Sequence, residues 1–194
     1  MGNFIIPIYS GQGGFAKNGY AENIEIEHPL KPGWLGVAFE EGYYINPFSL
    51  YQFQQELYPY SSAYTNYTAT PYEEIPVLVG IFVETTIKKF TFEFKGVAGM
   101  VLVTPPYINA TIKPGSRVDE LPQAVVFSTA NHKSYSFLAY SFGHSVSYQY
   151  TKHLSVHGNL AYFNDFSNAS GCSSVLPLSQ LHLEIGLAYH ILQD

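Results

Sequence analysis

The segment at residues 163–169 holds a serine and an aspartate, residue types that occur in nucleophilic catalysis. Ser167 offers a hydroxyl nucleophile, and Asp165 lies two positions before it. A serine attacks efficiently only when a base within hydrogen-bond reach accepts its proton. No histidine lies in the segment. Asp165 and Ser167 are therefore retained only as an alternative catalytic pair, because Asp, Ser and Asn also commonly end a strand and start a loop.

The seven histidines and the single cysteine do not predict a metal or cofactor site. His182 and His190 would lie about 26 Å apart on an extended strand, and His153 and His157 about 13 Å apart. Neither pair can share an ion, although pairing of His157 with His182 across strands stays open. One cysteine allows no intramolecular disulfide and no cysteine-based zinc site. We expect neither a metal nor a cofactor.

Charged side chains recur at alternate positions in otherwise small or apolar segments. Buried carboxylates are costly unless they are paired or hydrogen-bonded. Lys95 and the histidines are the groups that could pair with them. The set forms either a structural polar plug or, as the alternative, a path for protons or cations. Its members are Glu25, Glu27, Glu40, Glu84, Glu93, Lys95, His157, His182 and Glu184.

The elements that must position these groups are strands with two different faces. In residues 181–191, Leu, Ile and Tyr alternate with His, Glu, Gly and Ala. Such a period of two is the signature of a strand with one apolar face. The same pattern predicts eight strands, at residues 3–9, 20–29, 34–46, 75–85, 90–103, 135–150, 154–163 and 181–191.

The connections between these strands alternate in length. Residues 30–33, 86–89 and 151–153 form short turns, whereas residues 10–19, 47–74, 104–134 and 164–180 form long loops. Short periplasmic turns and long extracellular loops are typical of outer-membrane barrels. The pattern predicts an all-β fold of one domain over residues 1–194, an eight-stranded antiparallel up-and-down transmembrane β-barrel.

Composition supports a membrane location without transmembrane helices. Charged residues make up 12% of the chain and aromatic residues 16%, so the chain has about half the usual charge of a soluble domain. No apolar run approaches the roughly 20 residues that a membrane-spanning helix needs. Only helices and closed barrels satisfy their backbone groups in lipid. The net charge of −6 argues against a nucleic-acid partner.

The face of each strand that lies between the large apolar residues consists of small, mostly uncharged side chains. This composition indicates which face points into the barrel and which points outward. A soluble barrel would present charged residues outside, whereas Gly, Ala, Ser, Asn, Glu and His suit a narrow lumen. Aromatic residues also gather near strand ends, as they do at membrane interfaces. We therefore expect a lipid-facing apolar exterior and a filled polar interior. The aromatic residues are Trp34, Tyr43, Tyr148, Tyr150, Tyr162 and Tyr189.

Several segments resemble the small outer-membrane β-barrel proteins of the Bacteroidetes type. They are residues 75–81, 89–104, 136–144, 160–163 and 183–191. The resemblance implies an OmpX-like barrel in the bacterial outer membrane, and it implies no single activity. Residues 163–169 also resemble the His-x-Ser-Asn stretch of outer-membrane lipid A deacylases, but Asp165 stands where the histidine is expected. No leader sequence is visible, so we expect a mature form or a form made for recombinant expression.

The long connection at residues 47–74 is rich in tyrosine, which supplies large contact area at low entropic cost. We expect a non-enzymatic barrel that acts through its loops and its lipid-facing surface, in contact with outer-membrane lipid. It would be free-standing or an accessory subunit among other outer-membrane proteins. The alternatives are a lipid A deacylase-like hydrolase and a narrow channel. The expected loop contacts are Tyr51, Tyr58, Tyr60, Tyr64 and Tyr67.

Overall fold

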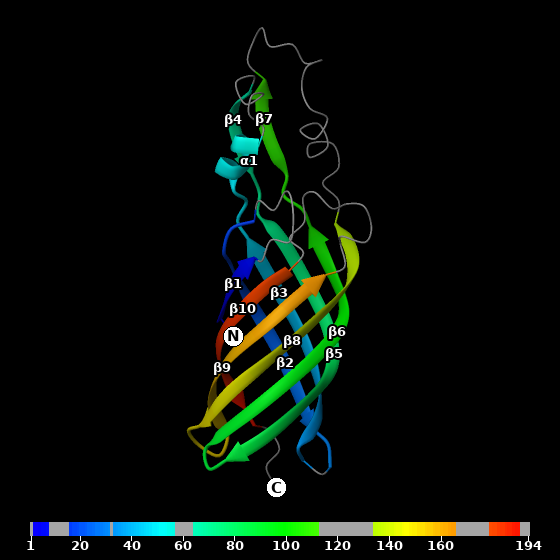
Figure 1. Ribbon diagram of the computed structural model, residues 1–194, viewed down its shortest axis with the longest axis vertical. Helices are drawn as coiled ribbons and strands as arrows, with labels where there is room; N and C mark the ends of the chain where they lie inside the picture. Colours follow the sequence, from blue (N-terminus) through cyan, green and yellow to red (C-terminus); the bar gives the residue numbers. More distant parts are fainter. Residues whose placement is uncertain are drawn as a thin grey trace.

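The computed structural model describes residues 2–7, 16–31, 33–56, 64–112, 134–165 and 179–190. Within these residues eight antiparallel strands close into a barrel, in the order β1-β10-β9-β8-β6-β5-β3-β2 (Figure 1). The predicted all-β, eight-stranded antiparallel barrel is therefore confirmed. Its strands are β1 (Gly2–Pro7), β2 (Gly19–Pro29), β3 (Leu35–Asn46), β5 (Tyr72–Ile87), β6 (Phe90–Thr104), β8 (Tyr135–Gln149), β9 (Leu154–Asp165) and β10 (Ser179–Tyr189).

Regular structure also occurs inside two of the long connections, where none was predicted. Helix α1 (Leu50–Glu56) and strand β4 (Tyr64–Ala69) lie between β3 and β5, and strand β7 (Ile108–Ile112) follows β6. β4 and β7 pair with each other as a separate two-stranded sheet. Figure 1 shows this sheet and α1 beyond one end of the barrel. No helix in the described part of the chain is long and apolar enough to cross a membrane.

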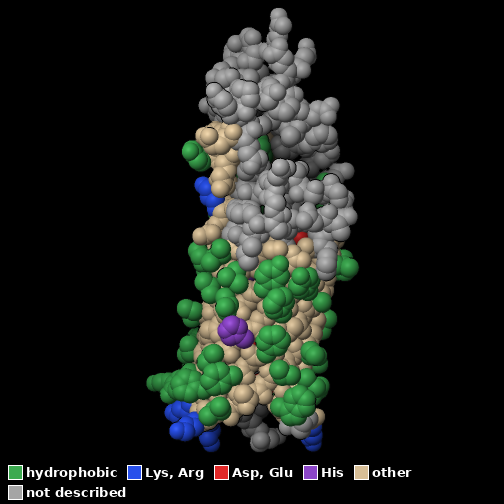
Figure 2. Space-filling model, in the orientation of Figure 1, with side chains coloured by type: hydrophobic (Ala, Val, Ile, Leu, Met, Phe, Trp, Pro, Cys, Tyr) green, Lys and Arg blue, Asp and Glu red, His purple; other side chains and the backbone are tan. Residues whose placement is uncertain are grey.

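The outer wall of the barrel is apolar, as the alternation predicted. Ile185 is 74% exposed, Leu187 64% and Val79 63%. Figure 2 shows hydrophobic side chains spread over the wall, with lysine side chains at its lower rim. Because such a surface is unfavourable in water and favourable in hydrocarbon, it fits a lipid environment.

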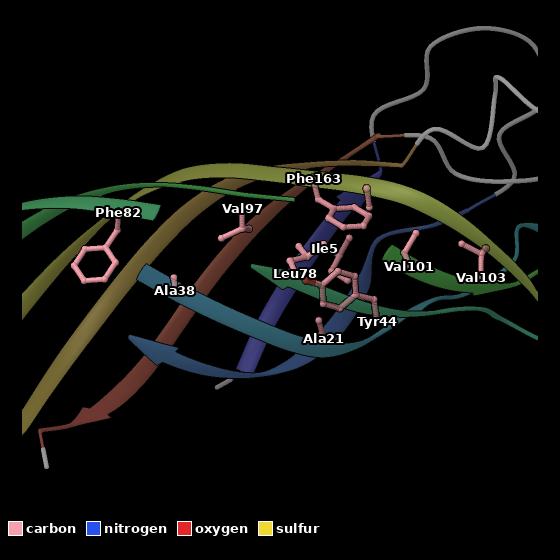
Figure 3. Close-up of a cluster of buried hydrophobic side chains, with 11 residues drawn as sticks. Ile5, Ala21, Ala38, Tyr44, Leu78, Phe82, Val97, Val101, Val103 and Phe163 are labelled. Atoms are coloured by element: carbon pink, nitrogen blue, oxygen red, sulfur yellow. The ribbon is translucent and has the colours of Figure 1, made fainter. Parts of the chain in front are cut away.

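The interior is less polar than the sequence led us to expect. A cluster of apolar side chains also points inward (Figure 3). Large rings fit because glycines face them: a Cβ on Gly36 would overlap the Phe82 ring, and one on Gly42 would lie 2.6 Å from the Tyr44 ring. The cluster consists of Ile5, Ala21, Ala38, Tyr44, Leu78, Phe82, Val97, Val101, Val103, Ala139 and Phe163.

The close approach of β5 to β6 leads to a first prediction about stability. A Cβ on the inward-facing Gly80 would lie 2.6 Å from Val97 Cα, whereas one on the outward-facing Gly96 would meet no atom within 4 Å. We expect Gly80→Val to lower the free energy of unfolding by about 1–3 kcal/mol through overpacking. Gly96→Val should change it by less than about 0.5 kcal/mol.

Urea unfolding of the two variants in lipid vesicles, followed by the gel shift between folded and unfolded barrel, measures this difference. Equal midpoints for Gly80→Val and Gly96→Val would contradict the close approach of the two strands.

Candidate functional site

The centre of the barrel holds a lysine surrounded by carboxylates. Lys95, on the inner face of β6, is 6% exposed, and it is the only buried lysine or arginine among the described residues. Its Nζ forms an ion pair with Glu25 of β2 and lies 3.9 Å from Glu40 Oε2 of β3. The Tyr44 hydroxyl donates a hydrogen bond to Glu40 Oε1 at 3.1 Å. Strands β2, β3 and β6 are thus joined across the lumen by a charge-assisted cluster.

Glu184 of β10 is held by two amides from other strands. Asn23 Nδ2 donates to Glu184 Oε1 at 3.1 Å, and Asn159 Nδ2 donates to Glu184 Oε2 at 3.0 Å. Asn23 Nδ2 also lies 3.5 Å from Glu40 Oε1, which links this group to the Lys95 cluster. Glu184 is only 5% exposed. The hydrogen bonds that both of its oxygens accept from neutral donors offset the cost of burying this carboxylate.

The network continues toward the long-loop end of the barrel. Gln180 Nε2 donates to both carboxylate oxygens of Glu74, at 2.7 and 2.8 Å. Gln180 Oε1 lies 3.1 Å from His182 Nε2, and His182 Nδ1 lies 3.9 Å from Glu184 Oε1. Tyr44 packs on the His182 ring at a centroid distance of 4.7 Å. The lumen is therefore crossed by side chains at successive levels.

A second acidic cluster lies nearer the short turns. Carboxylate oxygens of Glu25, Glu27 and Glu93 lie within 4.8 Å of one another, and Glu84 stands opposite Glu93 in the register of β5 and β6. Glu27 is exposed, whereas Glu84 and Glu93 are half-buried. The cluster thus faces the turn-side mouth of the barrel. Lys95 already neutralises part of it through Glu25.

The histidines are kept apart by the strand register. His157, 8% exposed, lies opposite Gly186, and His182, 2% exposed, lies opposite Ala161. The cross-strand pairing of His157 with His182 that the sequence left open is therefore wrong. His190 instead contacts Ser155, with 2.7 Å between Nε2 and Oγ.

Sequence reasoning missed two interior carboxylates. Glu74 is fully buried and Asp165 is 2% exposed. Glu74 falls in the predicted loop at residues 47–74, and the sequence suggests Asp165 only as a catalytic residue. The signal was present, because Glu74 shares the parity of the inward-facing Leu78, and Asp165 that of Phe163. Extending each alternation by one period would have found both.

Above the barrel, the described parts of three connections are tied together into a platform, defined as residues 16–18, 46–56, 64–72 and 104–112. Phe48 packs on Phe53 of α1 at 5.5 Å and on Tyr72 at 6.0 Å between ring centroids. Lys17 N donates to the Pro47 carbonyl at 2.8 Å. These contacts connect α1 to the buried top of β5, because Tyr72 is fully buried.

The same platform includes the β4–β7 sheet. Thr70 N donates to the Tyr107 carbonyl at 3.0 Å, and Tyr107 N donates back to Thr70 Oγ1 at 2.8 Å. Asn46 Nδ2 donates to the Lys17 carbonyl at 3.1 Å. The connections between β3 and β5 and between β6 and β8 are thus held to each other and to the barrel.

The predicted loop and catalytic residues are only partly described. Tyr51 lies on α1 and is 70% exposed. Tyr64 and Tyr67 lie on β4, but their side chains are outside the described residues, as are Tyr58, Tyr60 and Ser167 entirely. Asp165 sits on the inner face at the loop end of β9, so the carboxylate of the alternative catalytic pair faces the lumen.

Comparison with known proteins supports the fold. No family model and no curated protein matches the chain. The crystal structure of Neisserial surface protein A (NspA) matches with a TM-score of 0.56 and 8% identity, over 97% of this chain and 90% of that one. The attachment invasion locus protein Ail of Yersinia pestis matches with a TM-score of 0.50 and 10% identity, over 97% and 91% of the two chains. The chain has the fold of these eight-stranded outer-membrane barrels, in agreement with the predicted location in the bacterial outer membrane.

Proposed function

We propose that this protein is a non-enzymatic outer-membrane barrel that does not conduct and that acts through its extracellular platform. The barrel anchors and orients the platform, which contacts a partner at the cell surface. The protein is either free-standing or an accessory subunit of a larger outer-membrane assembly. Its relation to the Bacteroidetes proteins that its strands resemble stays a prediction.

The filled lumen carries this proposal. An eight-stranded barrel leaves just enough interior for side chains to fill. Here the apolar cluster and the hydrogen-bonded carboxylates share that space, and Lys95 joins strands from different sides. A conducting path would need ordered polar groups along an open channel. The interior polar groups therefore serve to fix the barrel, as a structural plug.

The construction of the platform supports a role in surface contact. Long loops on a rigid scaffold commonly carry binding residues. Here the platform has its own helix and sheet and is attached by the Phe48, Phe53 and Tyr72 cluster. Preorganised loops lose less entropy on binding than unstructured ones. Ail is named the attachment invasion locus protein, and contact at the surface is what we propose for this chain too.

Nothing in the described residues favours the hydrolase. The Asp165 carboxylate is 2% exposed on the lumen side, whereas a lipid ester would approach from the outer wall. We expect purified protein and the Ser167→Ala variant to show the same absence of lipid A deacylation. Activity in the unmodified protein that Ser167→Ala removes would replace our proposal with the enzyme.

Planar-bilayer recording tests the absence of conduction. We expect no single-channel steps from folded protein, because side chains block the lumen at several levels. Folding and insertion are checked in the same preparation by the heat-dependent gel shift. Regular ion-selective steps that change in the Lys95→Met variant would establish a channel through the acidic interior and overturn the proposal.

Photo-crosslinking in intact cells tests the platform. A photoreactive residue replaces Tyr51, which is 70% exposed on α1, or Tyr150, which is 71% exposed at a short turn. We expect one discrete crosslinked partner from position 51 that is absent from position 150. Exposed tyrosines are frequent binding hot spots, so Tyr51→Ala should weaken that contact about tenfold. The same adducts from both positions, or none from position 51, would argue against the platform as the binding surface.

A further inference from the structure

A groove runs across the outer wall of the barrel, and its lining also includes three residues whose side chains face the lumen: Ala21, Asn159 and Glu184. Its volume is about 790 Å³, and it passes from β8 over β9, β10 and β1 to β2. The large side chains along it belong to the outward faces of these strands, since Phe4 is 47% exposed and Leu183 44%. Its lining includes Phe4, Tyr20, Glu22, His144, Val146, Gly158, Leu160, Leu183 and Ile185.

The groove follows the strand register. Ile185 lies opposite Gly158, which lies opposite Val146, and this row forms one side. Leu183 lies opposite Leu160, which lies opposite His144, and this row forms the other side. Gly158 leaves the groove open, because the nearest atom to an added Cβ would be the Glu184 carbonyl oxygen at 3.9 Å. The groove is thus a trench between two rows of side chains.

The two ends of the groove lie at different depths. Tyr20 and Glu22 belong to the loop-side half of β2, whereas His144 and Val146 belong to the turn-side half of β8. The groove therefore rises obliquely from the middle of the apolar wall toward the loop-side rim. Four strand spacings correspond to about 19 Å, and one leaflet of hydrocarbon is about 15 Å deep. These lengths match a single acyl chain lying obliquely in the outer leaflet.

The upper end also has a defined chemistry. The exposed Glu22 lies opposite Tyr43 in the register of β2 and β3, and Tyr20 is 54% exposed on the groove itself. Tyrosines of this kind occupy the headgroup level of a membrane. The carboxylate of Glu22 at that level attracts a cationic headgroup. It repels an anionic headgroup whose phosphate carries no attached amine.

We propose that this groove is a lipid site, which seats one acyl chain of an outer-leaflet lipid and places an amine of its headgroup beside Glu22. The apolar rows hold the chain by close packing. Glu22 selects the headgroup, and Gly158 provides the space for the chain. The chemical class of the ligand is therefore an amine-bearing lipid, for which phosphatidylethanolamine serves as the probe.

Native mass spectrometry of protein released from nanodiscs of equimolar phosphatidylethanolamine and phosphatidylglycerol tests the site. We expect one retained lipid per chain, with phosphatidylethanolamine favoured about two- to fivefold, as one exposed ion pair allows. Gly158→Leu fills the groove without a clash and should reduce the retained lipid at least about fivefold. Glu22→Gln should keep the lipid and abolish the headgroup preference.

Gly96→Leu is the matched control, because Gly96 lies on the outer face of β6, away from the groove, and an added Cβ there meets no atom within 4 Å. It should retain lipid like the unmodified protein. If Gly158→Leu does not fold, Val146→Phe narrows the turn-side end of the groove and should also reduce retention. Equal retention in the groove variants and in Gly96→Leu, or retention of a second copy of the chain in place of lipid, would overturn the proposal.

Discussion

Replacing Lys95 with methionine should lower the free energy of unfolding by about 3–5 kcal/mol, the largest single effect we expect in this protein. The lysine is 6% exposed and pairs with Glu25 and Glu40. Methionine fills similar space but leaves these carboxylates without their cation in a low-dielectric interior. The loss of stability therefore reflects uncompensated buried charge and not a cavity.

Equilibrium unfolding in urea, performed in lipid vesicles, measures this change. The triple variant with Lys95→Met, Glu25→Gln and Glu40→Gln removes the charges together and should recover most of the lost stability, since removing a whole buried ion cluster is often close to neutral. Lys152→Met, at an exposed turn, controls for the loss of a lysine as such. If Lys95→Met matches Lys152→Met in stability, the central cluster does not hold the barrel together.

The second large effect concerns the outer wall. Val79 and Ile87 both face outward on β5, at 63% and 60% exposure. Val79 lies in the middle of the apolar run, whereas Ile87 is the last residue of the strand beside a short turn. An arginine in the middle of the bilayer should cost about 2–4 kcal/mol, and one near the interface about 0–1 kcal/mol.

Val79→Arg should therefore unfold at a distinctly lower urea concentration than Ile87→Arg when both are folded into the same vesicles. The comparison isolates the effect of depth in the bilayer, because both positions lie on the same face of the same strand and are similarly exposed. A similar midpoint for both variants would mean that position 79 meets water, and the lipid-facing assignment of β5 would be wrong.

Most of the barrel could be predicted from the sequence because its physical signal is local. Alternation with a period of two reports which residues share a face, and β6 and β10 show it almost without interruption. Turn lengths then fixed the antiparallel order, since short connections join neighbouring strands. The predicted ends differ from the observed ones by a few residues, as at β5, which begins at Tyr72 and not at residue 75.

The platform could not be predicted, because its structure depends on contacts between distant segments. β4 pairs with β7 far along the chain, as in the pair Thr65 and Thr111, which are 46 residues apart. Among the described residues, neither strand pairs with another segment of its own connection. Helix α1 spans only seven residues, too few for a clear helical period. Its stability comes from packing of Phe53 on Phe48, which the sequence does not reveal.

The candidate interior site could be predicted only in part. Parity predicts that Glu40, Lys95 and Glu184 share the lumen, but it does not predict which groups meet. The pairings depend on the stagger of the closed barrel, which brings Asn23 of β2 to Glu184 of β10. Residues just beyond the predicted strand ends, such as Glu74, were missed although they share the parity of the inward-facing side chains.

The most direct test of the account is the accessibility of spin labels along the wall, in lipid vesicles and in a Cys172→Ser background. Labels at Val79, Met100 and Ile185, which are 63%, 56% and 74% exposed, should collide with oxygen dissolved in the bilayer and be shielded from a water-soluble nickel complex. Labels at the buried Ala38 and Ala139 should be shielded from both. Strong collision of the outward labels with the nickel complex would contradict a lipid-facing wall around a filled interior.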